Sequence, residues 1–142
     1  MSLMVTYSYR KQINILIVNA WRMHLGFLID NGYWNWLENI EVLIRKEKPL
    51  SFRFSYEDWY SKAIFLVKTL HPKALEEFSL LYINKNAVIS DPRIYTISDF
   101  LFGNEIRRSH DYHAKKDAVK RNFEIQIKIL EQIRLDLINT LS

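Results

Sequence analysis

The sequence contains no cysteine, which excludes disulfide frameworks, zinc–thiolate sites and enzymes with a cysteine nucleophile. No apolar run approaches the roughly 20 residues that a membrane-spanning helix needs. The richest run is broken by Asn14, Asn19, Arg22 and His24. The beginning of the chain also lacks the basic-then-apolar order of a secretory signal. The sequence therefore indicates a protein of a reducing compartment, and we expect it in the cytoplasm and without a membrane partner.

Glycine and proline are scarce, with only 3 of each in the chain. This scarcity excludes the glycine-rich phosphate loops and nucleophile elbows of many enzymes, and no H-E-x-x-H metal motif occurs. The few glycines and prolines are expected where helices end. Long stretches without them, with apolar residues at spacings of three and four, favour helices.

Apolar residues make up 49% of the 142 residues and aromatic residues 14%, which excludes a disordered chain. This length suffices for one core, so we expect a single helical domain over residues 1–142. Residues 1–3 resemble a leader added for expression, with Met4 as the native start. The net charge of +4 is lower than that of most dedicated nucleic-acid-binding domains, although a local basic patch could still bind nucleic acid.

The first helix is predicted within residues 8–32, where Asn31-Gly32 is typical of a helix C-terminus. Its expected buried stripe consists of Ile13, Leu16, Ile17, Ala20, Trp21, His24, Leu25 and Leu28. Ile15, Val18, Phe27 and Ile29 lie off this stripe, so much of the circumference is apolar and the helix is expected to be central. His24 is then expected to be a core histidine with one hydrogen-bond partner.

A second helix is predicted over residues 33–48, ended by Pro49. The alternation in residues 49–55 suggests a short extended segment. Ser55, with Asp58 three residues later, resembles a cap that opens a third helix over residues 56–70.

Further helices follow Pro72, which ends the third helix and can occupy the first turn of the next. Residues 84–93 have the composition of a loop, and Thr96 and Gly103 are expected to bound a short helix. The last helix is predicted over residues 111–140. Its seam is Val119, Phe123, Ile127, Leu130, Ile133, Leu137 and Leu141. The predicted fold is an all-α bundle of about five or six helices with a long C-terminal helix.

Residues 105–116, EIRRSHDYHAKK, form the best candidate for chemistry. Arg108 and His113 have the arginine-then-histidine spacing of the HEPN-domain ribonucleases, in which this pair opens the last long helix of a small bundle. The resemblance implies metal-independent RNA cleavage, with His113 exchanging a proton and Arg108 holding the phosphate. Ser109 departs from that family's usual amide or acid, and small apolar residues before His113 are missing. The alternative interpretation is a solvated helix start.

The same window suggests two other kinds of site. His110 and His113 are spaced to share a zinc or nickel ion, but no third ligand is identifiable, so no metal or other cofactor is predicted. The basic residues expected to contact nucleic-acid phosphates are Arg107, Lys115, Lys116, Lys120 and Arg121. A solvated surface paired through Asp117 and Arg121 explains the same charges.

Aromatic residues concentrate between residues 33 and 60, with Arg53 among them. Platforms for single-stranded nucleic acid interleave aromatic residues with cations, but core packing uses the same residues more often. Tyr33, Trp34 and Trp36 cannot all point inward from one helix face. Trp34 and Trp36 are therefore the predicted protein-interaction surface.

Part of the chain, from Tyr56 to Leu130, resembles the N-terminal segment of a family of uncharacterised bacterial helical proteins. The resemblance is carried by Trp59-Tyr60, Leu70 to Pro72, Glu77 to Tyr82 and Ile97 to Leu101. Longer members continue into a second helical domain that looks HEPN-like. The resemblance implies a bacterial or mobile-element origin and a non-catalytic role for this domain, and the family pattern does not require Arg108 and His113.

The leading hypothesis is a cytoplasmic interaction domain rather than an enzyme. Its expected partner is a second copy, bound through the aromatic region or the last helix, or a second protein domain. One alternative is a HEPN-type ribonuclease related to toxins or phage defence that uses Arg108 and His113. A second alternative is RNA or other nucleic-acid binding through the basic start of the last helix.

Overall fold

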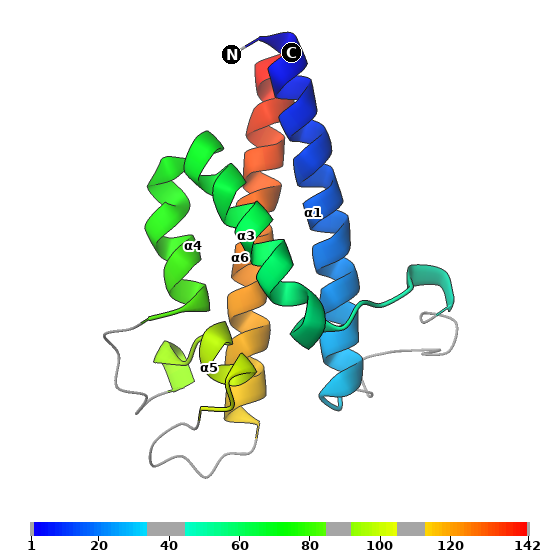
Figure 1. Cartoon of the computed structure of the whole chain (residues 1–142), viewed down its shortest axis with the longest axis vertical. Helices are drawn as coiled ribbons and strands as arrows, with labels where there is room; N and C mark the ends of the chain where they lie inside the picture. Colours follow the sequence, from blue (N-terminus) through cyan, green and yellow to red (C-terminus); the bar gives the residue numbers. More distant parts are fainter. Residues whose placement is uncertain (1, 34–44, 85–91, 105–112, 142) are drawn as a thin grey trace. The chain divides into compact units, whose positions relative to one another are not determined.

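The computed structural model describes residues 2–33, 45–84, 92–104 and 113–141 (Figure 1). Within these residues the α-helices are α1 (Leu3–Asp30), α3 (Phe52–Leu70), α4 (Leu75–Tyr82), α5 (Ile97–Leu101) and α6 (Ala114–Leu141). Two single turns of 3-10 helix, η2 (Pro72–Ala74) and η3 (Pro92–Ile94), precede α4 and α5. The described residues contain no strand, so the predicted all-α class and long C-terminal helix are confirmed. None of the described helices is both long and apolar enough to span a membrane.

The chain divides into two compact units. The first unit comprises Met1–Ala63 and Arg134–Ser142, so it contains α1, the first part of α3 and the end of α6. The second unit is Ile64–Ile133 and contains the rest of α3, both 3-10 turns, α4, α5 and most of α6.

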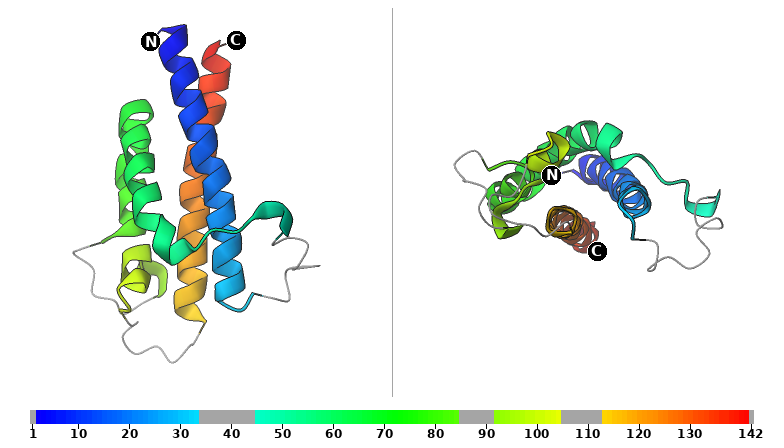
Figure 2. Two further views of the ribbon diagram at one scale, coloured as in Figure 1. Left: turned by 45° about the vertical axis from the view of Figure 1, so that its right-hand side comes forward. Right: turned by 90° about the horizontal axis from the view of Figure 1, so that it is seen from below.

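The core of the first unit lies on one side of α1. In Figure 1 and in the left view of Figure 2, α1 and the last turns of α6 lie side by side. The side chains that α1 buries include Ile13, Leu16, Ile17, Ala20, Met23, Phe27 and Leu28. Four rings continue this core, with centroids 5.2 Å apart for Phe27 and Phe52, 5.1 Å for Phe52 and Tyr56, and 5.7 Å for Tyr56 and Trp59. The core-packing interpretation of Phe52, Tyr56 and Trp59 is confirmed.

Helix α3 begins at Phe52, earlier than predicted. Ser51 caps it, because the Ser51 Oγ accepts a hydrogen bond from the Phe54 N–H at 3.3 Å. The Ser51 carbonyl also accepts from the Ser55 N–H at 3.0 Å. The predicted cap at Ser55 and the extended segment over residues 49–55 are therefore wrong. Phe52, Tyr56 and Trp59 are spaced by four and three residues, so a helix that starts at Phe52 directs all three into the core.

Residues 48–50 cross α1 at Gly26. The Leu50 N–H donates to the Arg22 carbonyl at 3.0 Å, and the Arg22 Nε donates to the Lys48 carbonyl at 2.8 Å. A Cβ atom at position 26 would lie 2.0 Å from the Leu50 carbonyl oxygen. The expectation that glycines mark helix ends holds for Gly32 and Gly103, which have φ values of +82° and +75°. It is wrong for Gly26, which stands inside α1 because a crossing backbone leaves no room for a side chain.

The second unit is held together by buried amides on α6. Gln126 Nε2 donates to the Phe78 carbonyl at 3.1 Å, and Asn122 Nδ2 donates to the Tyr95 carbonyl at 2.8 Å. Both amide side chains are buried, so they link α6 by hydrogen bonds to the backbone of α4 and of the segment before α5. The predicted seam of α6 is buried at Val119, Phe123, Ile127, Leu130, Ile133 and, in the first unit, Leu137.

Helix α5 has the ends that the sequence predicted. Thr96 Oγ1 accepts from the Asp99 N–H at 3.2 Å, and Asp99 Oδ2 accepts from the Thr96 N–H at 3.0 Å, which completes a capping box. Gly103 follows its C-terminus with positive φ. The predicted second helix and the predicted loop at 84–93 lie largely outside the described residues, with a helical turn at 45–47.

Candidate interaction surface

Several predicted site residues, namely Trp34, Trp36, Arg107, Arg108 and His110, lie outside the described residues. His113 is described, and it is exposed directly before the first residue of α6. The geometry of the Arg108–His113 pair is therefore not among the described features, and its catalytic role stays a prediction. The same holds for the His110–His113 metal hypothesis.

The basic residues predicted to bind nucleic acid are distributed around α6. Successive residues of an α-helix are rotated by about 100°, so Lys115, Lys116 and Arg121 point in three directions about 100–140° apart. Lys120 Nζ lies 3.2 Å from Glu124 Oε1 in an ion pair. These four described positions do not form one basic stripe. Nucleic-acid binding through this segment stays a prediction.

A hollow of about 510 Å³ occurs in the second unit, beside α4 and η3. Its lining includes the apolar side chains of Leu80 and Leu81 together with cations and carboxylates: Lys73, Arg93, Glu76 and Glu77. Among the described residues no buried side-chain nitrogen or oxygen lacks a hydrogen-bond partner, and no three acidic or histidine side chains gather as a metal ion requires. This hollow therefore points to no particular class of ligand.

Among the described helices, α1 carries the most exposed large apolar side chains, and several of them lie on the side opposite its buried residues. We define the outer face of α1 as Met4, Tyr7, Lys11, Ile15, Val18, Trp21, Arg22 and Leu25, which follow one another at helical spacing. The exposed fractions are 84% for Met4, 67% for Tyr7, 52% for Ile15, 57% for Val18 and 45% for Trp21. From Met4 to Trp21 these apolar side chains extend over about five helical turns.

The outer face corrects three expectations about α1. The helix is not enclosed on all sides, because Ile15 and Val18 are exposed. Trp21 was expected on the buried stripe, but it is 45% exposed. His24 was expected in the core, but it is half-buried, and its ring meets the Trp21 ring edge-on with centroids 5.2 Å apart. The physical reason is that the core of the first unit covers only the side centred on Ile13, Ala20 and Phe27.

One end of the outer face is hollowed. A depression of about 550 Å³ is lined by the apolar side chains of Val18, Trp21, Leu25 and Leu28, with Arg22, His24 and Glu47 also on its wall. At the other end, Met4 and Tyr7 are 84% and 67% exposed. We call Met4 and Tyr7 the N-terminal ridge, so the same helix face carries large exposed side chains at its N-terminal end and an apolar depression toward its C-terminal end.

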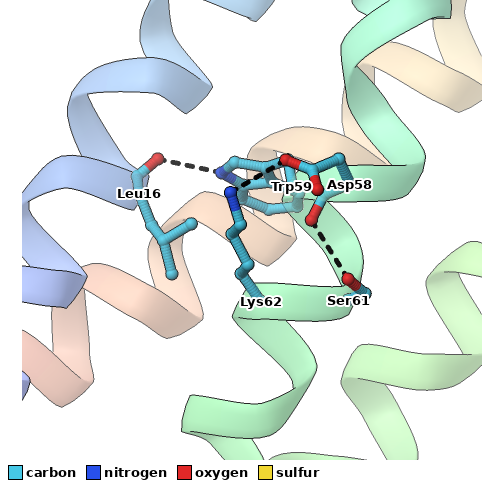
Figure 3. A network of polar contacts seen from close by, with 5 residues as sticks. All are labelled: Leu16, Asp58, Trp59, Ser61 and Lys62. Atoms are coloured by element: carbon cyan, nitrogen blue, oxygen red, sulfur yellow. Dashed lines mark hydrogen bonds and ion pairs between the residues drawn. The ribbon is translucent and has the colours of Figure 1, made fainter.

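The orientation of α1 is fixed from its inner side by Trp59 (Figure 3). The buried indole Nε1 donates to the Leu16 carbonyl at 2.9 Å, which links α3 to the middle of α1. Next to Trp59, Asp58 Oδ2 lies 3.0 Å from Lys62 Nζ, and the Ser61 Oγ donates to the Asp58 carbonyl at 3.2 Å. Because Leu16 is tied to the core, α1 cannot rotate to bury Ile15 and Val18 without losing this hydrogen bond.

Comparisons with protein-family models, with curated proteins and with solved structures each give no significant match.

Proposed function

We propose that this protein is a helical protein–protein interaction domain that associates with a second copy of itself through the outer face of α1. One observation carries the proposal: five large apolar side chains, from Met4 to Trp21, are about half exposed or more along a single helix face. Aromatic side chains have on the order of 150–250 Å² each and aliphatic ones less, so this row exposes on the order of 600 Å². That is the upper end of the roughly 300–600 Å² of the largest apolar patch on a typical monomer, which is often functional.

The sequence-based expectations concern the compartment, the origin and the role of this domain. The lack of cysteine favours the cytoplasm, and the resemblance to the N-terminal segment of bacterial proteins favours a bacterial origin and a non-catalytic role beside a HEPN-like domain. The proposal changes one expectation, because it assigns self-association to α1 rather than to the aromatic region or the last helix.

Sedimentation velocity over a concentration series tests the proposal. The wild-type protein is expected to shift from monomer to dimer as the concentration rises. Val18→Lys is expected to weaken dimerisation at least about tenfold, because it adds a third cation to the middle of an apolar contact whose α1 face already carries Lys11 and Arg22 and no acidic residue. Gln12→Lys is the matched control, since Gln12 is exposed on α1 but outside the outer face, and it adds the same charge.

The outcomes separate clearly. A Val18→Lys protein that remains helical and monomeric, beside a Gln12→Lys protein that dimerises like the wild type, supports the proposal. A wild-type protein that stays monomeric at every concentration contradicts it, as does a dimer that Val18→Lys leaves unchanged.

A further inference from the structure

We infer that the two copies pair antiparallel through α1, so that the N-terminal ridge of each copy fills the apolar depression of the other. This inference rests on the proposed function and specifies its geometry. The contact is centred between Asn14 and Ile15. Met4 then faces Leu25 of the second copy, and Lys11 faces Val18 of the second copy.

Shape is the first argument for this arrangement. The ridge formed by Met4 and Tyr7 and the depression lined by Val18, Trp21 and Leu25 lie at opposite ends of one helix face. A two-fold axis across the middle of α1 brings each ridge onto the other copy's depression, so one patch serves both copies. A parallel pair would instead place ridge against ridge and depression against depression.

Charge is the second argument. The charged residues of α1 are Arg10, Lys11, Arg22 and Asp30, so its outer face carries cations without an acidic residue. A parallel pair in register would set Lys11 against Lys11 and Arg22 against Arg22. An antiparallel pair centred between Ile15 and Val18 would set Lys11 against Arg22. Both arrangements bring like charges together in a contact from which water is displaced.

The inferred register avoids these repulsions. Lys11 faces Val18 of the second copy, and the two Lys11 side chains are offset by seven residues, or about 10 Å along the axis, which is close to the Debye length at moderate salt. Arg22 faces Tyr7 of the second copy, where the guanidinium can lie against the ring. Arg22 is already held in place on its own chain by the Lys48 carbonyl at 2.8 Å.

Area is the third argument. The exposed apolar row contributes on the order of 600 Å² from each copy, or about 1,200 Å² for the pair, which reaches the lower end of the range for specific interfaces. A register centred between Ile15 and Val18 would set Met4 and Tyr7 against Ile29 and Gly26, beyond Leu25, where the outer face ends. The register centred between Asn14 and Ile15 covers the whole row.

Cysteine cross-linking tests the geometry directly, because the chain contains no cysteine of its own. Ile15→Cys lies beside the two-fold axis and is expected to give a disulfide-linked dimer on mild oxidation. Met4→Cys and Leu25→Cys are each expected to stay monomeric on a non-reducing gel, because equivalent positions lie about 30 Å apart along the axis. An equimolar mixture of Met4→Cys and Leu25→Cys is expected to give a covalent heterodimer. Gln12→Cys, outside the outer face, is the control that should remain monomeric.

The results distinguish the inference from the proposed function. Cross-linking of Ile15→Cys and of the mixture, but not of the single end variants, supports the antiparallel register. Efficient cross-linking of Met4→Cys with itself, or no cross-linking of Ile15→Cys in a protein that dimerises through Val18, overturns the register and leaves the proposed function standing. A protein that is monomeric in sedimentation and gives no cross-link in any variant overturns both.

Discussion

Replacing Gly26 with alanine tests the crossing of residues 48–50 over α1. Alanine is the better helix former by about 1 kcal/mol, so helix propensity alone predicts a more stable protein. The structure predicts the opposite. The new Cβ would meet the Leu50 carbonyl oxygen at 2.0 Å, whereas ordinary contact begins at 3.4 Å, so that carbonyl must retreat by about 1.4 Å.

The cost of this retreat has two parts. Forcing an extra carbon into a packed contact costs about 1–3 kcal/mol. Losing the hydrogen bond from the Leu50 N–H to the Arg22 carbonyl costs about 1 kcal/mol more. After the gain in helix propensity is subtracted, we expect Gly26→Ala to lower the free energy of unfolding by about 1–3 kcal/mol.

Chemical denaturation followed by circular dichroism measures this free energy, and hydrogen exchange adds a local readout. The Leu50 amide is expected to exchange faster in Gly26→Ala. Gly32→Ala is the control, because a Cβ there meets nothing within 4 Å and the cost comes only from the positive φ. It should lower stability by about 1–2 kcal/mol and leave exchange at Leu50 unchanged. A Gly26→Ala protein as stable as the wild type, or more stable, would refute the reasoning.

Three further substitutions test the cores of the two units by denaturant unfolding. Trp59→Phe is expected to lower the free energy of unfolding by about 1–3 kcal/mol, because it removes the hydrogen bond to the Leu16 carbonyl and part of a buried ring. Phe54→Ala is the control, since the Phe54 side chain is 90% exposed, and it should lower this free energy by less than about 0.5 kcal/mol. Equal effects of the two changes would contradict the assignment of Trp59 to the core. Gln126→Met keeps the volume of a fully buried side chain but removes its hydrogen bond to the Phe78 carbonyl, so we expect the free energy of unfolding to fall by about 1–2 kcal/mol. Unchanged stability would show that this bond does not stabilise the packing of α6 against α4. Thr96→Ala removes the capping box of α5 and is expected to cost about 1 kcal/mol, while unchanged stability would mean that α5 does not need its cap.

Some elements could be predicted because their signals are local. Thr96 and Asp99 form a capping box within four residues, and Gly103 supplies the backbone conformation that ends α5. The seam of α6 is equally legible, since its apolar residues fall on one stripe and its other faces are mostly polar. Local signals of this kind need no knowledge of the rest of the fold.

Other features depend on contacts distant in the sequence. Gly26 looks like an unfavourable residue inside a helix until the Leu50 backbone is placed beside it. The start of α3 was misplaced because Ser51 and Ser55 are both acceptable caps. Only the requirement that Phe52 reach the core with Tyr56 and Trp59 selects Ser51.

The candidate surface was also hidden by the sequence pattern. A helix with apolar residues on two opposite sides gives no sign of which side the chain itself covers, and the expectation that α1 is central followed from that ambiguity. Trp34 and Trp36, the predicted contact residues, lie outside the described residues. The signal that could have found the surface is the spacing of Met4, Tyr7, Ile15 and Val18 on a second apolar stripe.

The two apolar sides of α1 are reconciled if the helix is completed by a second molecule. Within one chain, Ile13, Ala20 and Phe27 are covered while Ile15 and Val18 remain exposed. In the inferred antiparallel pair, each α1 would be buried on both sides, as its composition suggests. The expectation of a central α1 would then be wrong for the monomer and right for the dimer. Val18→Lys should therefore disturb association, because it faces Lys11 of the second copy, while Ala20→Lys should disturb folding itself, because Ala20 is fully buried in its own chain.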